Sequence, residues 1–234
     1  GPWLAALDFP FGQPYNLIAH LQWPEKWEDY VQMIMSMGKK EFEEMLKRYG
    51  EGRIKGDKLH LRATDAIVGA RSPMMLYRVP VGKMFFEGAT RLLQANVSVL
   101  PCRPTADNRI VVEGYPALVA HRFIGKQSYK SDEREKQTKA RENARREIVN
   151  GLRSSEIEKR YGFRVKLSDE MSERLVEDPK GDVLDAILCS VQGGWAWLQG
   201  FNSRELSGVY QKIEGWIVDP LAAIEGYMHI ERND

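Results

Sequence analysis

Apolar residues along the chain form short continuous runs separated by longer stretches with a helical period. The run Trp3–Leu7 is bounded by Pro2 and by a Pro- and Gly-containing turn, which predicts a strand buried on both faces with Asp8 at its carboxyl end. Two further runs, 97–100 and 110–113, also predict strands. These three segments are the expected sheet.

Helices are predicted where apolar residues recur every three or four positions. The longest such stretch, 24–49, contains Gly38, near which we expect a break. Residues 50–80 look irregular, and 214–218 is expected to form a small closing strand. The other predicted helices are 81–94, 116–123, 168–176 and 182–198.

The segment 130–150 mixes both signs of charge at helical spacing, which predicts a solvated helix, with a helix facing nucleic acid as the alternative. Strands that alternate with helices indicate an α/β fold with a substantial parallel component. No internal repeat, linker or domain boundary is visible. We therefore expect one domain over residues 1–234.

Composition narrows the functional classes. Lys plus Arg number 34 and Asp plus Glu number 33, so no overall attraction to polyanions is expected and any nucleic-acid binding must use local patches. Cys102 and Cys189 have no metal or redox spacing, which favours structural thiols in a reducing compartment. No run reaches the ~18 apolar residues of a membrane helix, and no signal peptide is visible, so a cytoplasmic location without a membrane partner is expected.

Four carboxylates stand where α/β folds build their sites. Asp8 and Glu113 each end an apolar strand, and ligands of open α/β sheets bind at the carboxyl ends of strands. Asp182 and Asp185 are three residues apart and share one face of an otherwise apolar helix. Because Asp185 has apolar neighbours, we expect it to be partly buried and to need a cation or a donor.

Clustered carboxylates without His or Cys suit hard cations, so the expected cofactor is Mg²⁺ or Mn²⁺ and the expected chemistry is phosphoryl transfer. Each acid also has a structural interpretation. Asp8 can cap a turn, Glu113 can pair with an Arg, and Asp182 can be a helix N-cap after Gly181. His20, His60, His121 and His229 have no ligand spacing and are expected to be structural.

Three blocks of sequence carry a resemblance to a known family. Residues 5–12 (AALDFPFG), 111–116 (VVEGYP) and 181–186 (GDVLDA) resemble three successive motifs of the domain of unknown function 429 family, which is predicted to consist of RNase H-like nucleases. The segments 78–86, 129–132 and 214–217 are also similar to family segments, so the resemblance runs through nearly the whole chain. The late Asp-x-x-Asp-Ala further resembles the ending of RuvC-type resolvases.

The resemblance implies an RNase H-like fold, with a mixed sheet flanked by helices and with helical insertions. It implies Asp8, Glu113 and Asp185 as metal ligands, with Asp182 assisting. Family members place a first acid on a strand upstream of the motif that Asp8 matches. The sequence opens at Gly1 without that strand, so either its first strands are missing, which we favour, or the chain lacks one ligand and is weakened or inactive.

The expected function is hydrolysis of DNA or RNA phosphodiesters by a divalent-metal-dependent nuclease. A non-catalytic RNase H-like interaction module and a phosphoryl hydrolase acting on a small phosphate ester are the alternatives. Lys83, Lys130 and Arg71 are the expected contacts to nucleic acid. Arg62 and Arg78 lie with Arg71 in the irregular segment, and the three are expected either to line a groove or to belong to a flexible basic loop.

Overall fold

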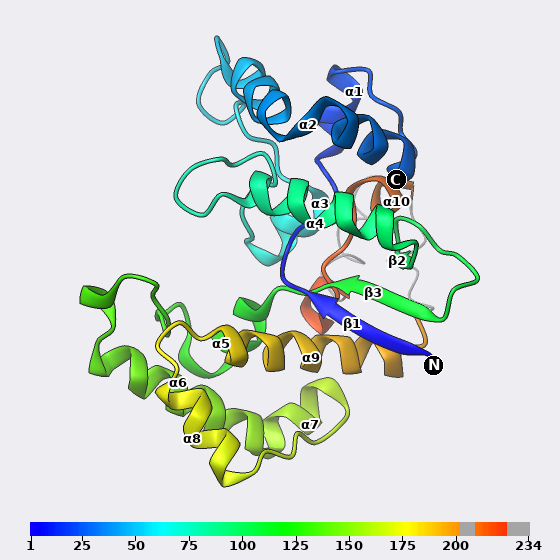
Figure 1. Ribbon diagram of the computed structural model, residues 1–234. Helices are drawn as coiled ribbons and strands as arrows, with labels where there is room; N and C mark the ends of the chain where they lie inside the picture. The colour runs from blue at the N-terminus through cyan, green and yellow to red at the C-terminus, as the bar shows by residue number, and fades with distance from the viewer. Residues whose placement is uncertain (202–208, 224–234) are drawn as a thin grey trace. The chain divides into compact units, whose positions relative to one another are not determined.

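The structure is a computed structural model that describes residues 1–201 and 209–223, and these confirm an α/β protein (Figure 1). The chain divides into two compact units. Of the described residues, unit 1 comprises 1–5, 9–113, 201 and 209–223, whereas unit 2 comprises 6–8 and 114–200. The expectation of one domain with missing first strands stays a prediction.

Three strands form the sheet in the order β1-β3-β2, where β1 is Trp3–Leu7, β2 is Ser98–Leu100 and β3 is Arg109–Glu113. Strands β2 and β3 are parallel, with Val99 opposite Val111, as the apolar runs predicted. The expected burial of β1 on both faces is wrong. Its position at the edge of the described sheet leaves Trp3 43% exposed and the rest of the strand half-buried.

Five helices of unit 1 accompany these strands. The break expected near Gly38 is confirmed, because Gly38 has a φ of 81° inside α2. Segment 50–80, expected to be irregular, contains α3, which follows Arg62 and closes at Gly69 in the left-handed conformation. The helices are α1 (Tyr15–His20), α2 (Trp27–Gly50), α3 (Ala63–Val68), α4 (Val81–Ala95) and α10 (Val209–Glu214).

The expected closing strand at 214–218 is reduced to one bridge, in which Ile217 pairs with Glu113 in parallel. Helix α10 takes Glu214, the first residue of the expected strand. The bridge is supported by the hydrogen bond from Val218 N to Glu113 O at 2.9 Å. Both sides of the bridge belong to unit 1.

Unit 2 is a helical layer around one apolar core. Its helices are α5 (Pro116–Ile124), α6 (Lys139–Arg153), α7 (Ser155–Tyr161), α8 (Asp169–Glu177) and α9 (Asp182–Leu198), and a 3-10 turn spans Arg134–Lys136. Apolar faces of α6, α8 and α9 contribute Ile148, Leu175 and Leu188 to the core. Ser168 caps α8 by accepting from Met171 N, at the start of the helix predicted over 168–176.

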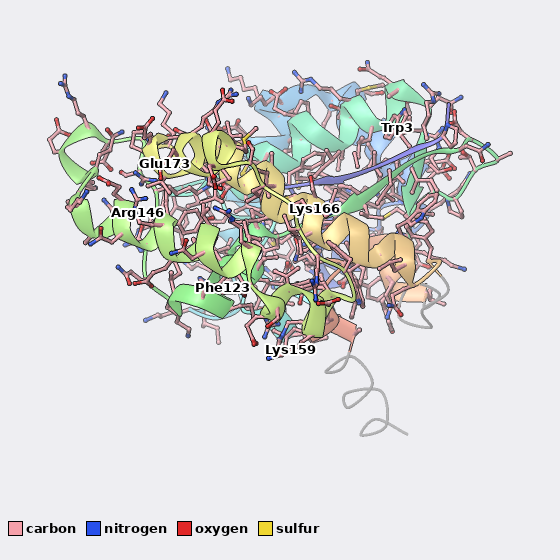
Figure 2. All side chains as sticks on the ribbon, turned by 90° about the horizontal axis from the view of Figure 1, so that it is seen from below. Trp3, Phe123, Arg146, Lys159, Lys166 and Glu173 are labelled. Atoms are coloured by element: carbon pink, nitrogen blue, oxygen red, sulfur yellow. The ribbon has the colours of Figure 1, made fainter. Side chains whose placement is uncertain are left out.

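The helix predicted over the charged segment 130–150 is confirmed for most of its length, because α6 begins at Lys139, and residues 130–138 lie before that helix. Those residues instead bond across the unit, as in the hydrogen bond from Ser131 N to Pro179 O at 3.0 Å. The helical part is amphipathic, and its solvated side includes Arg146, which pairs with Glu173 of α8 at 3.2 Å (Figure 2).

Both cysteines are free thiols, in agreement with the expected structural role. No helix in the described part of the chain combines the length and the apolar character that a membrane crossing requires.

Close packing at Gly12 gives a test of unit 1. A Cβ at Gly12 would lie 2.4 Å from the carbonyl oxygen of Glu214, and backbone atoms cannot yield as a side chain can. We expect Gly12→Ala to lower the free energy of unfolding by about 3 kcal/mol, measured by urea denaturation. The control is Gly50→Ala, because the nearest atom there is 3.8 Å away and Ala favours a helix by about 0.5–1 kcal/mol. Equal midpoints for the two variants would contradict the packing.

Candidate functional site

Helix α9 presents two of the predicted carboxylates from its first turn. Gly181 precedes the helix in the left-handed conformation, and Asp185 N donates to Gly181 O at 2.9 Å. The N-cap is Gly181, so the interpretation of Asp182 as the cap is wrong. Asp182 is exposed and Asp185 is only 7% exposed, as expected from its apolar neighbours. The apolar face of the same helix packs into the core and fixes both positions.

Asp185 is held by two neighbouring residues from the segment that precedes α6. Tyr129 Oη donates to Asp185 Oδ1 at 2.6 Å, and Lys130 Nζ forms an ion pair with Asp185 Oδ2. Arg145 Nη1 donates to Tyr129 O at 2.8 Å, which holds this segment from the other side. At Gly181 an added Cβ would lie 3.1 Å from Lys130 Cβ, so the turn before α9 packs directly against Lys130.

The charges of these groups are coupled. Burial raises the pKa of the Asp185 carboxyl, while the Lys130 ammonium and the Tyr129 hydroxyl oppose that rise. Burial by itself lowers the pKa of Lys130, but the carboxylates of Asp185, Asp8 and Asp182 outweigh burial and the pKa is raised.

Asp8 belongs to the same unit. It follows the last residue of β1, whose carbonyl accepts a hydrogen bond from Gly114 N at 2.9 Å. The Asp8 carboxylate is exposed, and its charge raises the pKa of Tyr129, of Lys130 and of the buried Cys189 thiol. The charges of three predicted acids, Asp8, Asp182 and Asp185, thus act on one ammonium group. Their formal charges exceed that of Lys130 by two.

This group of residues fits a divalent cation in charge and in ligand type. Within residues 1–201 and 209–223, no three His, Cys, Asp or Glu side chains stand close enough together to hold a metal ion by themselves. Mg²⁺, however, usually keeps several waters and binds through one or two carboxylates. Asp8 and Asp185 are the residues that would hold such an ion, since both act on Lys130 and on Cys189.

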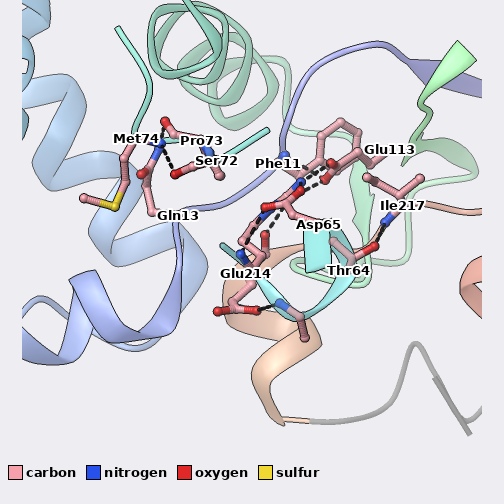
Figure 3. Close-up of polar contacts among 12 residues, drawn as sticks. Phe11, Gln13, Thr64, Asp65, Ser72, Pro73, Met74, Glu113, Glu214 and Ile217 are labelled. Atoms are coloured by element: carbon pink, nitrogen blue, oxygen red, sulfur yellow. Dashed lines mark hydrogen bonds and ion pairs between the residues drawn. The ribbon is translucent and has the colours of Figure 1, made fainter. Parts of the chain in front are cut away.

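Glu113 lies in unit 1, at the end of β3. It pairs with an arginine, as its structural interpretation from the sequence predicted. Its Oε2 accepts from Phe11 N at 2.9 Å and from Arg62 Nη1 at 2.8 Å, and its Oε1 accepts from Arg62 Nη2 at 2.5 Å (Figure 3). Both oxygens are therefore already used by donors. In this arrangement Glu113 has a structural role.

Arg62 is the centre of this buried cluster, so its expected place in a groove is wrong: it is 2% exposed. The guanidinium binds Asp65 as well as Glu113, at 2.7 Å from Asp65 Oδ1. Burial lowers the pKa of Arg62, but the two carboxylates outweigh it and the pKa is raised. The guanidinium also donates to the carbonyl of Glu214 at 3.0 Å and so connects α3, β3 and α10.

The Glu214 side chain closes the cluster. Tyr15 N donates to its Oε1 at 2.6 Å and Ala63 N donates to its Oε2 at 2.9 Å. Two buried carboxylates, those of Asp65 and Glu113, thus share one guanidinium, whereas the buried carboxylate of Glu214 is held by backbone N–H groups (Figure 3). Burial raises the pKa of Glu214, and the two N–H groups only partly oppose this effect.

The predicted contacts to nucleic acid are divided between the units. Lys83 and Arg71 belong to unit 1, where Lys83 pairs with Glu43 at 3.2 Å and Arg71 is exposed. Lys130 belongs to unit 2 and binds Asp185. Arg78 is exposed and has a positive φ of 58°.

The residues that the sequence did not single out are Tyr129, Asp65 and Glu214. Tyr129 stands beside Lys130 in the 129–132 block, so the signal for it was present. Asp65 follows Arg62 by three residues, and its Oδ2 accepts from the Arg62 backbone N–H at 3.0 Å, which is the half of a capping box that an arginine at the N-cap allows.

No protein-family model matches the chain, and no significant match to it is found among curated proteins or among solved structures. The interpretation of the site therefore rests on its geometry and chemistry.

Removing the buried guanidinium tests the cluster of unit 1. Arg62→Met leaves the carboxylates of Glu113 and Asp65 buried without a cation, so we expect a loss of about 3–5 kcal/mol in the free energy of unfolding. Chemical denaturation measures it. The control is Arg109→Met, which removes an exposed arginine paired with Asp107 at 2.6 Å and should leave the midpoint near that of wild type. A loss below about 1 kcal/mol for Arg62→Met would contradict the central role of this residue.

The pKa of Glu214 gives a pH dependence with a defined sign. Burial raises the pKa of Glu214 in the folded state above the usual 4.5 that applies in the unfolded state. At pH values between the unfolded-state pKa and the folded-state pKa, the folded state therefore binds more protons than the unfolded state. The free energy of unfolding should fall as pH rises through that window. We expect Glu214→Gln to flatten this fall in urea denaturation at a series of pH values from 4.5 upward. Glu173→Gln, on the exposed side of α8, should keep the wild-type slope; an unchanged slope in Glu214→Gln would refute the assignment.

Proposed function

We propose that the protein is a divalent-metal-dependent hydrolase of nucleic-acid phosphodiester bonds, with its metal site in unit 2. The observation that carries the proposal is the ion pair of the buried Asp185 with Lys130, on which the charges of Asp8 and Asp182 also act, so that negative charge exceeds positive charge by two. Asp8 and Asp185 would hold Mg²⁺ or Mn²⁺, and Asp182 would add negative charge beside them. We also propose an RNase H-like fold, which is supported by an acid at the end of β1 and a second acid on the late helix α9.

In the proposed reaction a water oxygen bonds to phosphorus, the bond to the leaving oxygen breaks, and the leaving oxygen takes up a proton. A bound divalent ion supplies an activated water and stabilises the charge that develops on the leaving oxygen. The protein's own groups position this chemistry. Tyr129 orients Asp185 through its hydroxyl, and Arg145 holds the Tyr129 backbone in place.

A second candidate function is a non-catalytic interaction module. It is favoured by the present partners of two predicted ligands, because Glu113 is occupied by Arg62 and Asp185 by Lys130 and Tyr129. In a non-catalytic module these carboxylates would only stabilise the fold.

Cleavage assays separate these functions. We expect the protein to cut labelled single- or double-stranded DNA or RNA in Mn²⁺, and Asp185→Asn to lower the rate by about 100-fold or more, since it removes a ligand charge. Asp8→Asn should give a similar loss without a folding defect, because Asp8 is exposed. The matched control is Asp169→Asn, whose side chain is 91% exposed on α8 and should retain full activity.

Activity that is equal in wild type, Asp8→Asn and Asp185→Asn would refute the site. No cleavage of any polymer, with hydrolysis of p-nitrophenyl phosphate, would instead favour a hydrolase of small phosphate esters. No hydrolysis of any substrate, with fully folded protein, would favour the non-catalytic module.

A further inference from the structure

We propose that Lys130 is an internal counter-ion that occupies the cation position of the unit 2 site, and that it must leave Asp185 before a divalent ion can bind there. This inference rests on the proposed function, since it concerns the same carboxylates. Under this inference Lys130 controls the affinity of the site for metal, which a lysine that only contacts phosphate would not do.

The contacts of Asp185 are the first step. One oxygen is satisfied by the Tyr129 hydroxyl at 2.6 Å, and the other is paired with the Lys130 ammonium. A carboxylate with 10% of its side chain exposed needs both partners, because an unpaired buried charge is costly. Any ion that binds Asp185 must therefore replace one of them.

Lys130 is the partner that can be replaced. Its side chain is 40% exposed, so the ammonium has a route to water, whereas Tyr129 is 6% exposed and Arg145 holds its backbone. The Lys130 backbone is fixed against Gly181 and by the neighbouring bond from Ser131 to Pro179. Only the flexible four-carbon side chain needs to move for the exchange.

The charges of the site favour replacement of the singly charged Lys130 ammonium by a divalent ion. Asp8 and Asp182 already act on the Lys130 ammonium together with Asp185, so the site has more negative charge than a single lysine neutralises. A divalent ion would balance that excess. The lysine that leaves stays tethered beside the site as a positive charge available to a substrate phosphate.

Binding of Mn²⁺, followed through the electron paramagnetic resonance signal of the free ion, tests the inference without any activity. A competing internal cation lowers the apparent affinity by the fraction of molecules in which the site is open, so we expect Lys130→Met to bind Mn²⁺ about 10-fold more tightly than wild type. Lys130→Arg keeps a permanent charge, and a guanidinium can form two hydrogen bonds to Asp185. This variant should therefore bind Mn²⁺ about 3-fold more weakly than wild type, or more weakly still.

The matched control is Lys166→Met, which removes an exposed lysine of the same unit (Figure 2). It should change the affinity by less than about 2-fold, because an exposed charge away from the site is screened. If Lys130→Met is unstable, Lys130→Arg still decides: equal or tighter binding by this variant overturns the inference.

The possible failures are distinguishable. Equal Mn²⁺ affinity in wild type and Lys130→Met overturns the counter-ion role and leaves the metal site standing. A similar gain in Lys166→Met shows a general charge effect and also overturns it. The absence of Mn²⁺ binding in wild type, Lys130→Met and Lys130→Arg alike overturns the proposed metal site itself, and the inference with it.

Discussion

An ionised side chain that leaves water must find an opposite charge inside the protein, and unit 1 depends on how Arg62 meets this requirement. The guanidinium has five N–H donors in a planar fork, and here they bind Asp65, Glu113 and the Glu214 carbonyl. One side chain therefore joins α3, the end of β3 and the end of α10. Gly12 and Gly215 pack closely around the same cluster, so its neighbours have little room to rearrange.

Unit 2 meets the same requirement with a different cation. A lysine ammonium is a compact charge on a flexible chain, and it binds one oxygen of Asp185 where Arg62 binds both oxygens of Glu113. Arg62 is 2% exposed, whereas the Lys130 side chain is 40% exposed. The first pair is thus built into the core, and the second remains accessible to water and to competing ions. This contrast separates a structural acid from a candidate ligand.

The periodicity of apolar residues was sufficient to predict the long helices and the strands. It was insufficient to predict which side chains pair with one another. Helices α2, α4 and α9 follow directly from apolar residues at helical spacing, and β2 and β3 follow from short apolar runs. Pairing is a different matter, because Arg62 and Glu113 are 51 residues apart and Lys130 and Asp185 are 55 apart. No local pattern encodes such contacts. The short helices α1, α3 and α7 were missed since six or seven residues show barely two turns of a period.

The placement of Glu113 changes what the predicted ligand set can be. Three motifs suggested one set of acids, yet the structure gives Glu113 to Arg62 in unit 1 and leaves Asp8 and Asp185 in unit 2. Two carboxylates suffice for a hydrated Mg²⁺, which completes its shell with water, and they hold it less tightly than three would. A weakly held ion is sensitive to any internal competitor. If the proposed metal binds here, the balance between Lys130 and the metal would therefore matter more than it would at a site with a full set of protein ligands.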